Sequence, residues 1–266
     1  MKFLLQKRQK YILYSLLSLL LILWLFSRGG PNISFSYKVL ITNLFCIVGA
    51  IFTQYPGINY KNAFPLVLLP LHLFIGTIFS LYFFPNLSVP FRVSALVFSS
   101  ISLYLISLVN NVFIVVEDKE DTIPLYRVAI TWAQILIVII AIPFFAGVFK
   151  IPANFIMQDL VVGASSFLFA LYLLWTLGFD REVVRIGAGE SIMMGLMVAF
   201  FAFSSALAVS FIPAESFLRS LLCAGSLMFG LNYMVLHYKN RLNKSIIFEY
   251  VFLLAIFLLL VLIFKP

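Results

Sequence analysis

The sequence predicts an all-α fold, a polytopic integral membrane bundle of about nine transmembrane helices, and three observations carry this prediction. First, 63% of the 266 residues are hydrophobic and 11% are charged, whereas soluble domains are roughly half apolar and a quarter charged. Second, the apolar residues form charge-free runs of about 20, the length that crosses about 30 Å of hydrocarbon as a helix. Third, these runs lack the polar and apolar alternation of membrane strands, which excludes a barrel.

The first predicted span follows the segment MKFLLQKRQK, a basic start that precedes an apolar centre, as in an export signal. No small-residue cleavage site follows, because the first alanine is Ala50, so we expect a retained first span. Charges and clusters of Pro and Gly divide the rest of the chain into eight further runs. The nine expected spans are residues 11–26, 39–55, 64–84, 93–116, 128–149, 155–177, 192–212, 217–236 and 246–264.

The distribution of basic residues predicts the orientation of the spans. Basic residues are enriched in the cytoplasmic loops of membrane proteins. With the amino end in the cytoplasm, twelve of the 18 bases lie on the cytoplasmic side, and nine spans place the carboxyl end outside. The expected location is a bacterial inner membrane. The cytoplasmic bases are Lys2, Lys7, Arg8, Lys10, Lys61, Lys119, Arg127, Arg181, Arg185, Lys239, Arg241 and Lys244.

Short connections predict a single membrane-embedded domain, residues 1–266. Nearly all of them are shorter than about fifteen residues, which leaves no room for a separate soluble domain. The net charge is +8, but the bases are scattered singly and form no stripe that could follow a phosphate backbone, so we expect no nucleic acid partner. Cys46 and Cys223 lie inside apolar runs and are interpreted as free packing thiols.

Small residues at helical spacing predict where helices approach closely. Gly163, Ser166 and Ala170 share one face of the sixth span. Ala199, Ala202 and Ala206 share a face of the seventh span, and Ser226 and Gly230 do so in the eighth. Such faces allow close helix contact in lipid. Spans six to eight are therefore expected to form a tight sub-bundle, and spans three, four, five and nine, rich in Phe, Leu and Ile, to face lipid.

His72 is the ionisable residue nearest the centre of a span. An ionisable group at membrane depth is a functional candidate, because placing it there is costly. Pro70 lies two residues earlier and frees one backbone carbonyl, which His72 or a neighbour could meet. His72 is either a midplane site of a transporter or a neutral histidine that bonds to another helix.

Asp159 and three amides complete the candidates within the spans. Asp159 stands about one turn into the sixth span, where it could bind a proton or a cation, or simply reach the membrane interface. Asn110, Asn111 and Gln134 lie near the cytoplasmic ends of the fourth and fifth spans. Amides at these depths either bond helices together or line a groove that opens to the cytoplasm.

The segment EDKEDTIPLYR, residues 117–127, connects the fourth and fifth spans and carries four acids. Asp118 and Asp121 could hold Mg²⁺ together with Asn111, since hard cations prefer oxygen ligands, or the segment could dock a basic partner. The spaced aspartates of intramembrane prenyltransferases are missing here. GAGE, residues 187–190, places glutamate where intramembrane aspartyl proteases have aspartate. We therefore assign no catalytic, cofactor or metal residues.

Residues 111–127, with Asn111 and the run TIPLYR before a long apolar span, resemble a segment of a multi-span membrane family found mainly in candidate-phylum bacteria. That resemblance implies a membrane bundle and no particular activity. Three hypotheses follow from the residues. The first is a non-enzymatic scaffold or assembly subunit in the lipid bilayer, with a protein partner at the cytoplasmic face. The second is a transporter for a small or lipid-like solute, and the third is a lipid-modifying enzyme at the cytoplasmic interface.

Overall fold

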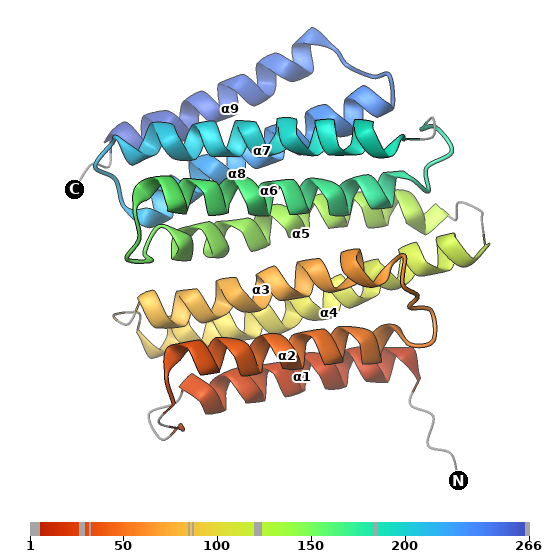
Figure 1. Cartoon of the computed structure of the whole chain (residues 1–266), viewed down its shortest axis with the longest axis vertical. Coiled ribbons are helices and arrows are strands. Elements are labelled where there is room, and N and C mark those ends of the chain that lie inside the picture. Colours follow the sequence, from red (N-terminus) through yellow and green to blue (C-terminus); the bar gives the residue numbers. More distant parts are fainter. Residues whose placement is uncertain are drawn as a thin grey trace. The chain divides into compact units, whose positions relative to one another are not determined.

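The computed structural model describes residues 6–26, 30–31, 33–84, 86, 88–119, 124–183 and 186–263. Within these residues the chain forms nine α-helices and no strand (Figure 1). The helices are α1 Lys7–Phe26, α2 Phe35–Gln54, α3 Ala63–Phe83, α4 Val89–Lys119, α5 Pro124–Val148, α6 Phe155–Leu177, α7 Ala188–Ser210, α8 Ser216–Tyr238 and α9 Lys244–Ile263.

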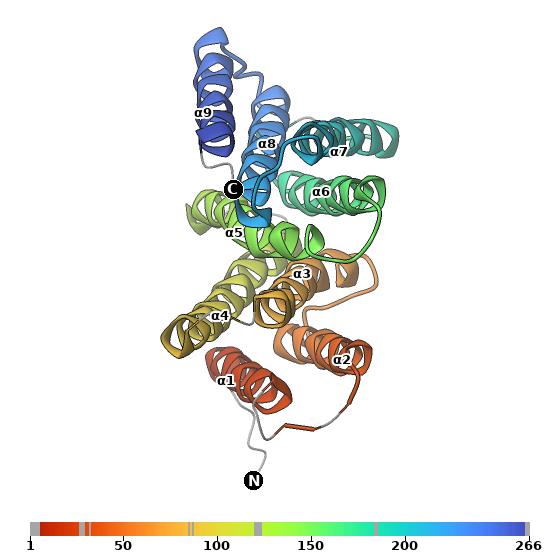
Figure 2. The ribbon, with the colours of Figure 1, turned by 90° about the vertical axis from the view of Figure 1, so that its left-hand side faces the viewer.

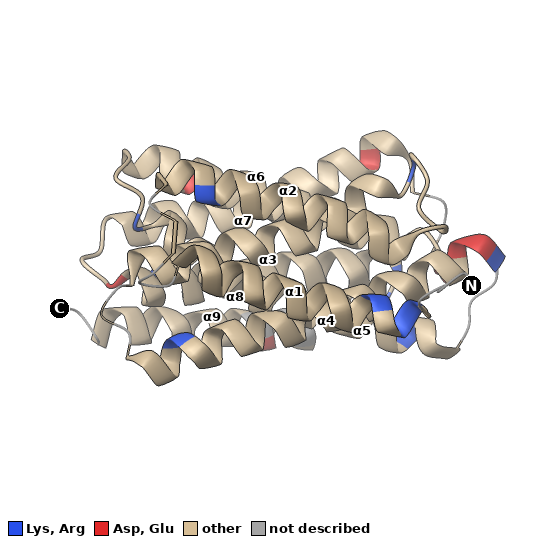
Figure 3. Ribbon diagram, turned by 90° about the horizontal axis from the view of Figure 1, so that it is seen from below, with Lys and Arg blue, Asp and Glu red and all other residues tan. Residues whose placement is uncertain are grey.

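The predicted polytopic all-α fold is confirmed. In the described part of the chain, eight helices, α1 to α8, are long and apolar enough to cross a membrane. The ninth helix, α9, contains a shorter apolar stretch, Val251–Ile263. Charged residues lie mostly near the helix ends and in the connections (Figure 3). This distribution suits a hydrocarbon interior, which charged side chains enter only at a high cost.

The chain divides into two compact units, Met1–Ala129 and Ile130–Pro266. Helix α5 begins in the first unit and continues into the second. Each unit is described separately below. The single domain and the orientation of the spans stay predictions.

The first unit contains helices α1 to α4, joined in chain order. Helix α1 packs against α2 and α4, and α3 packs against the same two helices (Figure 2). Since each helix runs back along the previous one, the starts of α1 and α3 lie at the same end as the last turns of α2 and α4. This up-and-down order gathers residues that are more than a hundred positions apart in the sequence.

Hydrogen bonds between helices reinforce this packing. The Tyr14 hydroxyl on α1 donates to the Cys46 carbonyl on α2 at 2.9 Å. Ser100 Oγ on α4 donates to the Ser15 carbonyl on α1 at 2.9 Å. The hydroxyls of Thr77 on α3 and Ser99 on α4 are 2.8 Å apart. Each bond satisfies a polar group that water cannot reach in a bilayer, so it also fixes the pairing of two helices.

The expectation that α3 and α4 face lipid is wrong. In each of these helices 56% of the spanning window is buried, against 17% in α2. Phe, Leu and Ile give no reliable signal of exposure here, because lipid chains and protein interiors are equally apolar.

In the second unit, α6, α7 and α8 form the tight sub-bundle that the small residues predict. Among the described helix pairs, the contact of α6 with α7 is the most extensive and that of α7 with α8 is the next. A Cβ atom added to Gly163 on α6 would lie 3.2 Å from Phe203 Cβ on α7. One added to Gly230 on α8 would lie 3.2 Å from Val198 Cγ1 on α7. Ser166, Ala170, Ala202 and Ala206 are fully buried.

Two ion pairs join the connection between α6 and α7 to the end of α8. Lys239 Nζ lies 2.8 Å from Asp180 Oδ2, and Arg241 Nη2 lies 2.9 Å from Glu182 Oε2. The first pair is largely buried and the second is exposed. Exposed pairs contribute little to stability, so of these two pairs the Lys239 pair contributes more.

We expect Gly49→Ala to destabilise the first unit. An added Cβ on α2 would overlap the buried ring of Tyr14, and overpacking of this kind costs about 1–3 kcal/mol. Thermal unfolding in detergent should show a lower Tm. Gly189→Ala is the matched control, because no atom lies within 4 Å of a Cβ at that position. Equal Tm values for the two variants would contradict the close contact of α1 and α2.

If α9 crosses the membrane, its two ends lie on opposite faces. We expect Asn240→Cys, an exposed position between α8 and α9, and a tag after the last residue to react with impermeant reagents from opposite sides of a sealed vesicle. Labelling of both from the same side would show that α9 lies on the membrane surface, and the carboxyl end would then share a side with the start of α9.

Candidate functional site

Three of the seven predicted site residues, Asn110, Asn111 and Asp118, lie at one end of the first unit. There the first turn of α1, the end of α2, the connection of residues 55–62 and the last turns of α4 come together. We call this group the amide cluster. It consists of Lys7, Gln54, Asn62, Asn110, Asn111 and Glu117, held by the hydrogen bonds described next.

Asn110 bonds α4 to α3. Its side chain is 1% exposed, and Nδ2 donates to the Leu66 carbonyl at 3.1 Å. In a regular helix this carbonyl accepts the N–H four residues later, but residue 70 is proline and has none. The Asn110 amide therefore replaces the missing donor across the helix interface. This is the helix-bonding role expected of amides at this depth.

Gln54 and Asn111 extend the cluster to α2 and α1. Gln54 is 1% exposed and donates from Nε2 to the Ser107 carbonyl on α4 at 3.0 Å. Its Oε1 is buried and has no hydrogen-bond partner. Lys7 Nζ donates to Asn111 Oδ1 at 2.9 Å. One face of α4 thus accepts hydrogen bonds from α1 and α2 and donates one to α3.

Glu117 fixes the connection between α2 and α3. Asn62 is fully buried and donates from Nδ2 to Glu117 Oε2 at 2.8 Å and to the Gly57 carbonyl at 3.2 Å. Its Oδ1 accepts from the Asn59 backbone at 2.8 Å. The first acid of the segment 117–127 is therefore structural. Sequence reasoning missed Asn62, because only the folded connection brings it to α4.

The proposed Mg²⁺ ligands are not brought together in the described part of the chain. Asp118 is exposed, whereas Asn111 is half-buried and bonded to Lys7. These two residues are seven positions apart on one helix, about 10 Å at 1.5 Å per residue. Asp121 lies outside the described residues. No group of three His, Cys, Asp or Glu among the described residues could hold a metal ion.

His72 is 5% exposed, and its Nδ1 lies 2.9 Å from the Leu68 carbonyl, one turn earlier in α3. A carbonyl only accepts, so Nδ1 carries a hydrogen. One side of the imidazole is thus engaged within its own helix. The packed alternative expected a bond to another helix, whereas this bond lies within α3, so both alternatives for His72 stay predictions.

Gln134 belongs to the second unit, where it is half-buried on α5. His72, Asn110 and Asn111 belong to the first. The groove that would join these residues stays a prediction.

Asp159 forms a second polar group, where α6 and α8 begin and α7 ends. The Asn154 side chain caps α6 by accepting from the Ile156 backbone at 3.2 Å. Asp159 follows in the second turn and is 0% exposed. Its side chain is covered by α7 and α8, and its depth relative to the membrane interface stays a prediction. Ser210 Oγ on α7 lies 3.0 Å from Asp159 Oδ1.

Arg219 provides the positive charge of this group. It lies in the first turn of α8, close enough for its charge to act on Asp159 and on the buried thiol of Cys223. Its Nη2 donates to the Ile212 carbonyl at 3.2 Å, and its guanidinium lies 5.9 Å from the centre of the Phe149 ring. Sequence reasoning did not connect Asp159 with Arg219, although both lie about one turn inside a span on the same predicted side.

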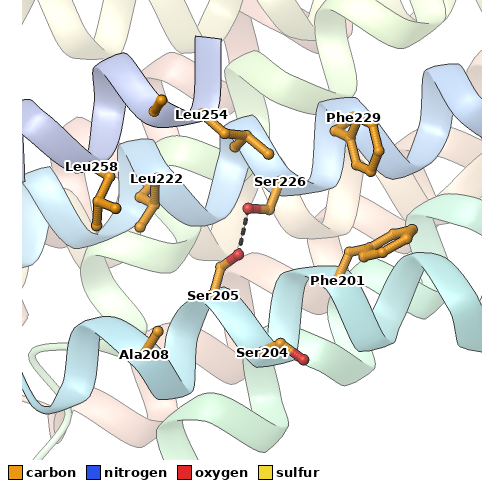
Figure 4. Close-up of a pocket in the computed structure, with 10 residues that line it drawn as sticks. Phe201, Ser204, Ser205, Ala208, Leu222, Ser226, Phe229, Leu254 and Leu258 are labelled. Atoms are coloured by element: carbon orange, nitrogen blue, oxygen red, sulfur yellow. Dashed lines mark hydrogen bonds between the residues drawn. The ribbon is translucent and has the colours of Figure 1, made fainter. Parts of the chain in front are cut away.

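A cavity of about 370 Å³ lies between α7, α8 and α9 (Figure 4). Its walls are mainly apolar, but the serines at 204, 205 and 226 also line it. The hydroxyls of Ser205 and Ser226 bond to each other across the interface of α7 and α8. A more open groove of about 570 Å³ runs along α6 and α7 and is lined by apolar residues and by small ones such as Gly163.

The chain matches no protein-family model, no curated protein and no solved structure. A proposed function therefore depends on the geometry alone.

We expect Asn110→Leu to lower stability by about 0.5–2 kcal/mol, the range of interhelical hydrogen bonds in membranes, because the Leu66 carbonyl loses its donor. Pro70→Ala restores a backbone N–H at the position that serves this carbonyl. In the Pro70→Ala background Asn110→Leu should therefore cost less. A double-mutant cycle measured by unfolding in detergent tests this. Additive effects would show that the Asn110 bond does not replace the missing N–H.

Proposed function

We propose that this protein is a non-enzymatic component of a membrane assembly, either a scaffold or a subunit. The observation that carries the proposal is the state of the amide cluster. Asn110 and Asn111, which the sequence puts forward for chemistry, are bonded to α3 and to α1, and Glu117 is bonded to the connection between α2 and α3. Side chains engaged in this way stabilise the bundle, and they are poorly placed to bind a substrate.

The end of α4 supports a partner at the same end of the first unit. Helix α4 has 31 residues, about 46 Å at 1.5 Å per residue, which exceeds the hydrocarbon thickness of about 30 Å. Glu117 is bonded to Asn62, but Asp118 and Lys119 are exposed. With the amino end in the cytoplasm, this charged end faces the cytoplasm of a bacterial cell. A basic segment of a partner protein is the complementary ligand.

The cavity between α7, α8 and α9 favours one second candidate, a carrier of a lipid-like solute. Its volume of about 370 Å³ lies within the range of roughly 300–1,000 Å³ that small-molecule sites occupy. Apolar walls suit an acyl or isoprenoid chain, and the hydroxyls of Ser204, Ser205 and Ser226 could meet a single polar group of that solute. In this candidate the solute binds in the second unit, and His72 has a packing role.

We expect Asp118→Lys to release the partner and leave the fold intact, because Asp118 is exposed and its charge faces solvent. The measurement is purification of the tagged protein from its native membrane in mild detergent, followed by mass spectrometry of the proteins bound to it. Glu215→Lys is the matched control, since Glu215 is an equally exposed acid at the start of α8.

Loss of a stoichiometric partner in Asp118→Lys alone would support the assembly role. A lone monomer from native membranes would contradict it. If that monomer carried a bound lipid that Ser205→Leu removes, the carrier would replace the scaffold as the proposed function. A bulky side chain at position 205 fills the cavity and leaves the amide cluster untouched.

A further inference from the structure

The hydroxyl of Ser210 has more acceptors than it can serve. Its Oγ lies 3.0 Å from the Ala206 carbonyl, 3.0 Å from Asp159 Oδ1 and 3.3 Å from Asp159 Oδ2. A serine hydroxyl carries one hydrogen, but its oxygen can also accept. An ionised Asp159 only accepts, so the single hydroxyl hydrogen of Ser210 can serve only one of the two contacts of 3.0 Å, and the other is then not a hydrogen bond.

A proton on Asp159 resolves this conflict. The protonated carboxyl donates to Ser210 Oγ, and Ser210 donates its own hydrogen to the Ala206 carbonyl, so both short contacts become hydrogen bonds. We propose that Asp159 is a proton-binding site, held in its neutral form by Ser210 and provided with Arg219 as the counter-ion of its ionised form.

Arg219 supplies an independent argument. Among the described residues its Nε is buried and has no hydrogen-bond partner, while its Nη2 is engaged with the Ile212 carbonyl. A fully buried carboxylate beside a guanidinium would be expected to draw this N–H into a charge-assisted bond. An Nε–H without a partner is expected when Asp159 is neutral, because a neutral carboxyl attracts the guanidinium only weakly. When Asp159 loses its proton, the Arg219 Nε–H can donate to the carboxylate.

Several elements carry the charged and titratable groups around the site. Helix α8 contributes Arg219 and the buried thiol of Cys223, and the exposed Glu215 directly precedes this helix. Helix α7 contributes the neutral hydroxyl of Ser210, and the connection from α5 to α6 carries the exposed Lys150 after Phe149. Since α6 and α8 begin here and α7 ends here, the proton exchanges with the side of the membrane on which these ends lie.

Release of the proton changes the contacts of three helices at once. Ser210 turns its hydrogen from the Ala206 carbonyl on α7 toward Asp159 on α6, and Arg219 on α8 gains an ionic partner. The proton moves from the carboxyl oxygen to water at the membrane surface, and no other bond is broken. The site therefore links proton occupancy to the packing of α6, α7 and α8. This inference is independent of the assembly role proposed above.

Infrared difference spectroscopy of the purified protein in lipid nanodiscs tests the proposal. At neutral pH the difference between the wild type and Asp159→Asn should contain the C=O stretch of a protonated carboxylic acid. Asp118→Asn is the matched control, because it removes an exposed carboxyl group of the first unit and should leave the acid band of Asp159 in place. Ser210→Ala should shift the acid band of Asp159, since the carboxyl loses the oxygen to which it donates.

Raising the pH should convert the Asp159 acid band into carboxylate bands in the wild type. A difference spectrum with only carboxylate bands at neutral pH would overturn the proposal and show a permanent ion pair with Arg219. An acid band that survives in Asp159→Asn would overturn it as well. If Asp159→Asn did not fold, an unshifted band in Ser210→Ala would count against the proposal and a shifted band would support it.

Discussion

Hydrocarbon offers no hydrogen-bond partner, and the architecture of the first unit depends on how its helices meet this constraint. Proline at position 70 removes a donor from the middle of α3, and Asn110 of α4 supplies one in its place at 3.1 Å. Tyr14, Ser100, Gln54 and Asn62 make comparable bonds between elements. The polar residues of this unit thus specify which helices pair and in which register.

The second unit meets the same constraint with fewer polar bonds and closer backbones. Gly163 and Gly230 bring α6, α7 and α8 together at distances that a methyl group would disturb. Two of its polar contacts between helices are the hydroxyl pair of Ser205 and Ser226 and the group around Asp159. Close packing gains dispersion energy where lipid provides no hydrophobic drive, so a buried carboxyl can be surrounded by neighbours that are already held in place.

The sequence was sufficient to predict the helices, because an apolar run long enough to cross a bilayer must form a helix there to pair its backbone groups. It also predicted the contact faces of α6 to α8, since Gly, Ala and Ser at helical spacing have a single physical use in lipid. The carbonyl freed by Pro70 could be expected, but its partner Asn110 could not, because their meeting depends on the register of α3 against α4. Asn62 and Glu117 meet only after the connection between them folds. The burial of Asp159 likewise depends on the packing of α7 and α8 over it, and the sequence of α6 does not show that packing.

The continuity of α4 has a mechanical consequence. After Pro90 the helix contains neither proline nor glycine up to Lys119, the residues at which sharp bends usually occur. The exposed tip and the buried contact at Asn110 are therefore parts of one stiff rod. A tilt imposed on the exposed end of α4 therefore also moves the interface with α3. Binding at the membrane surface can in this way change the packing inside the bilayer.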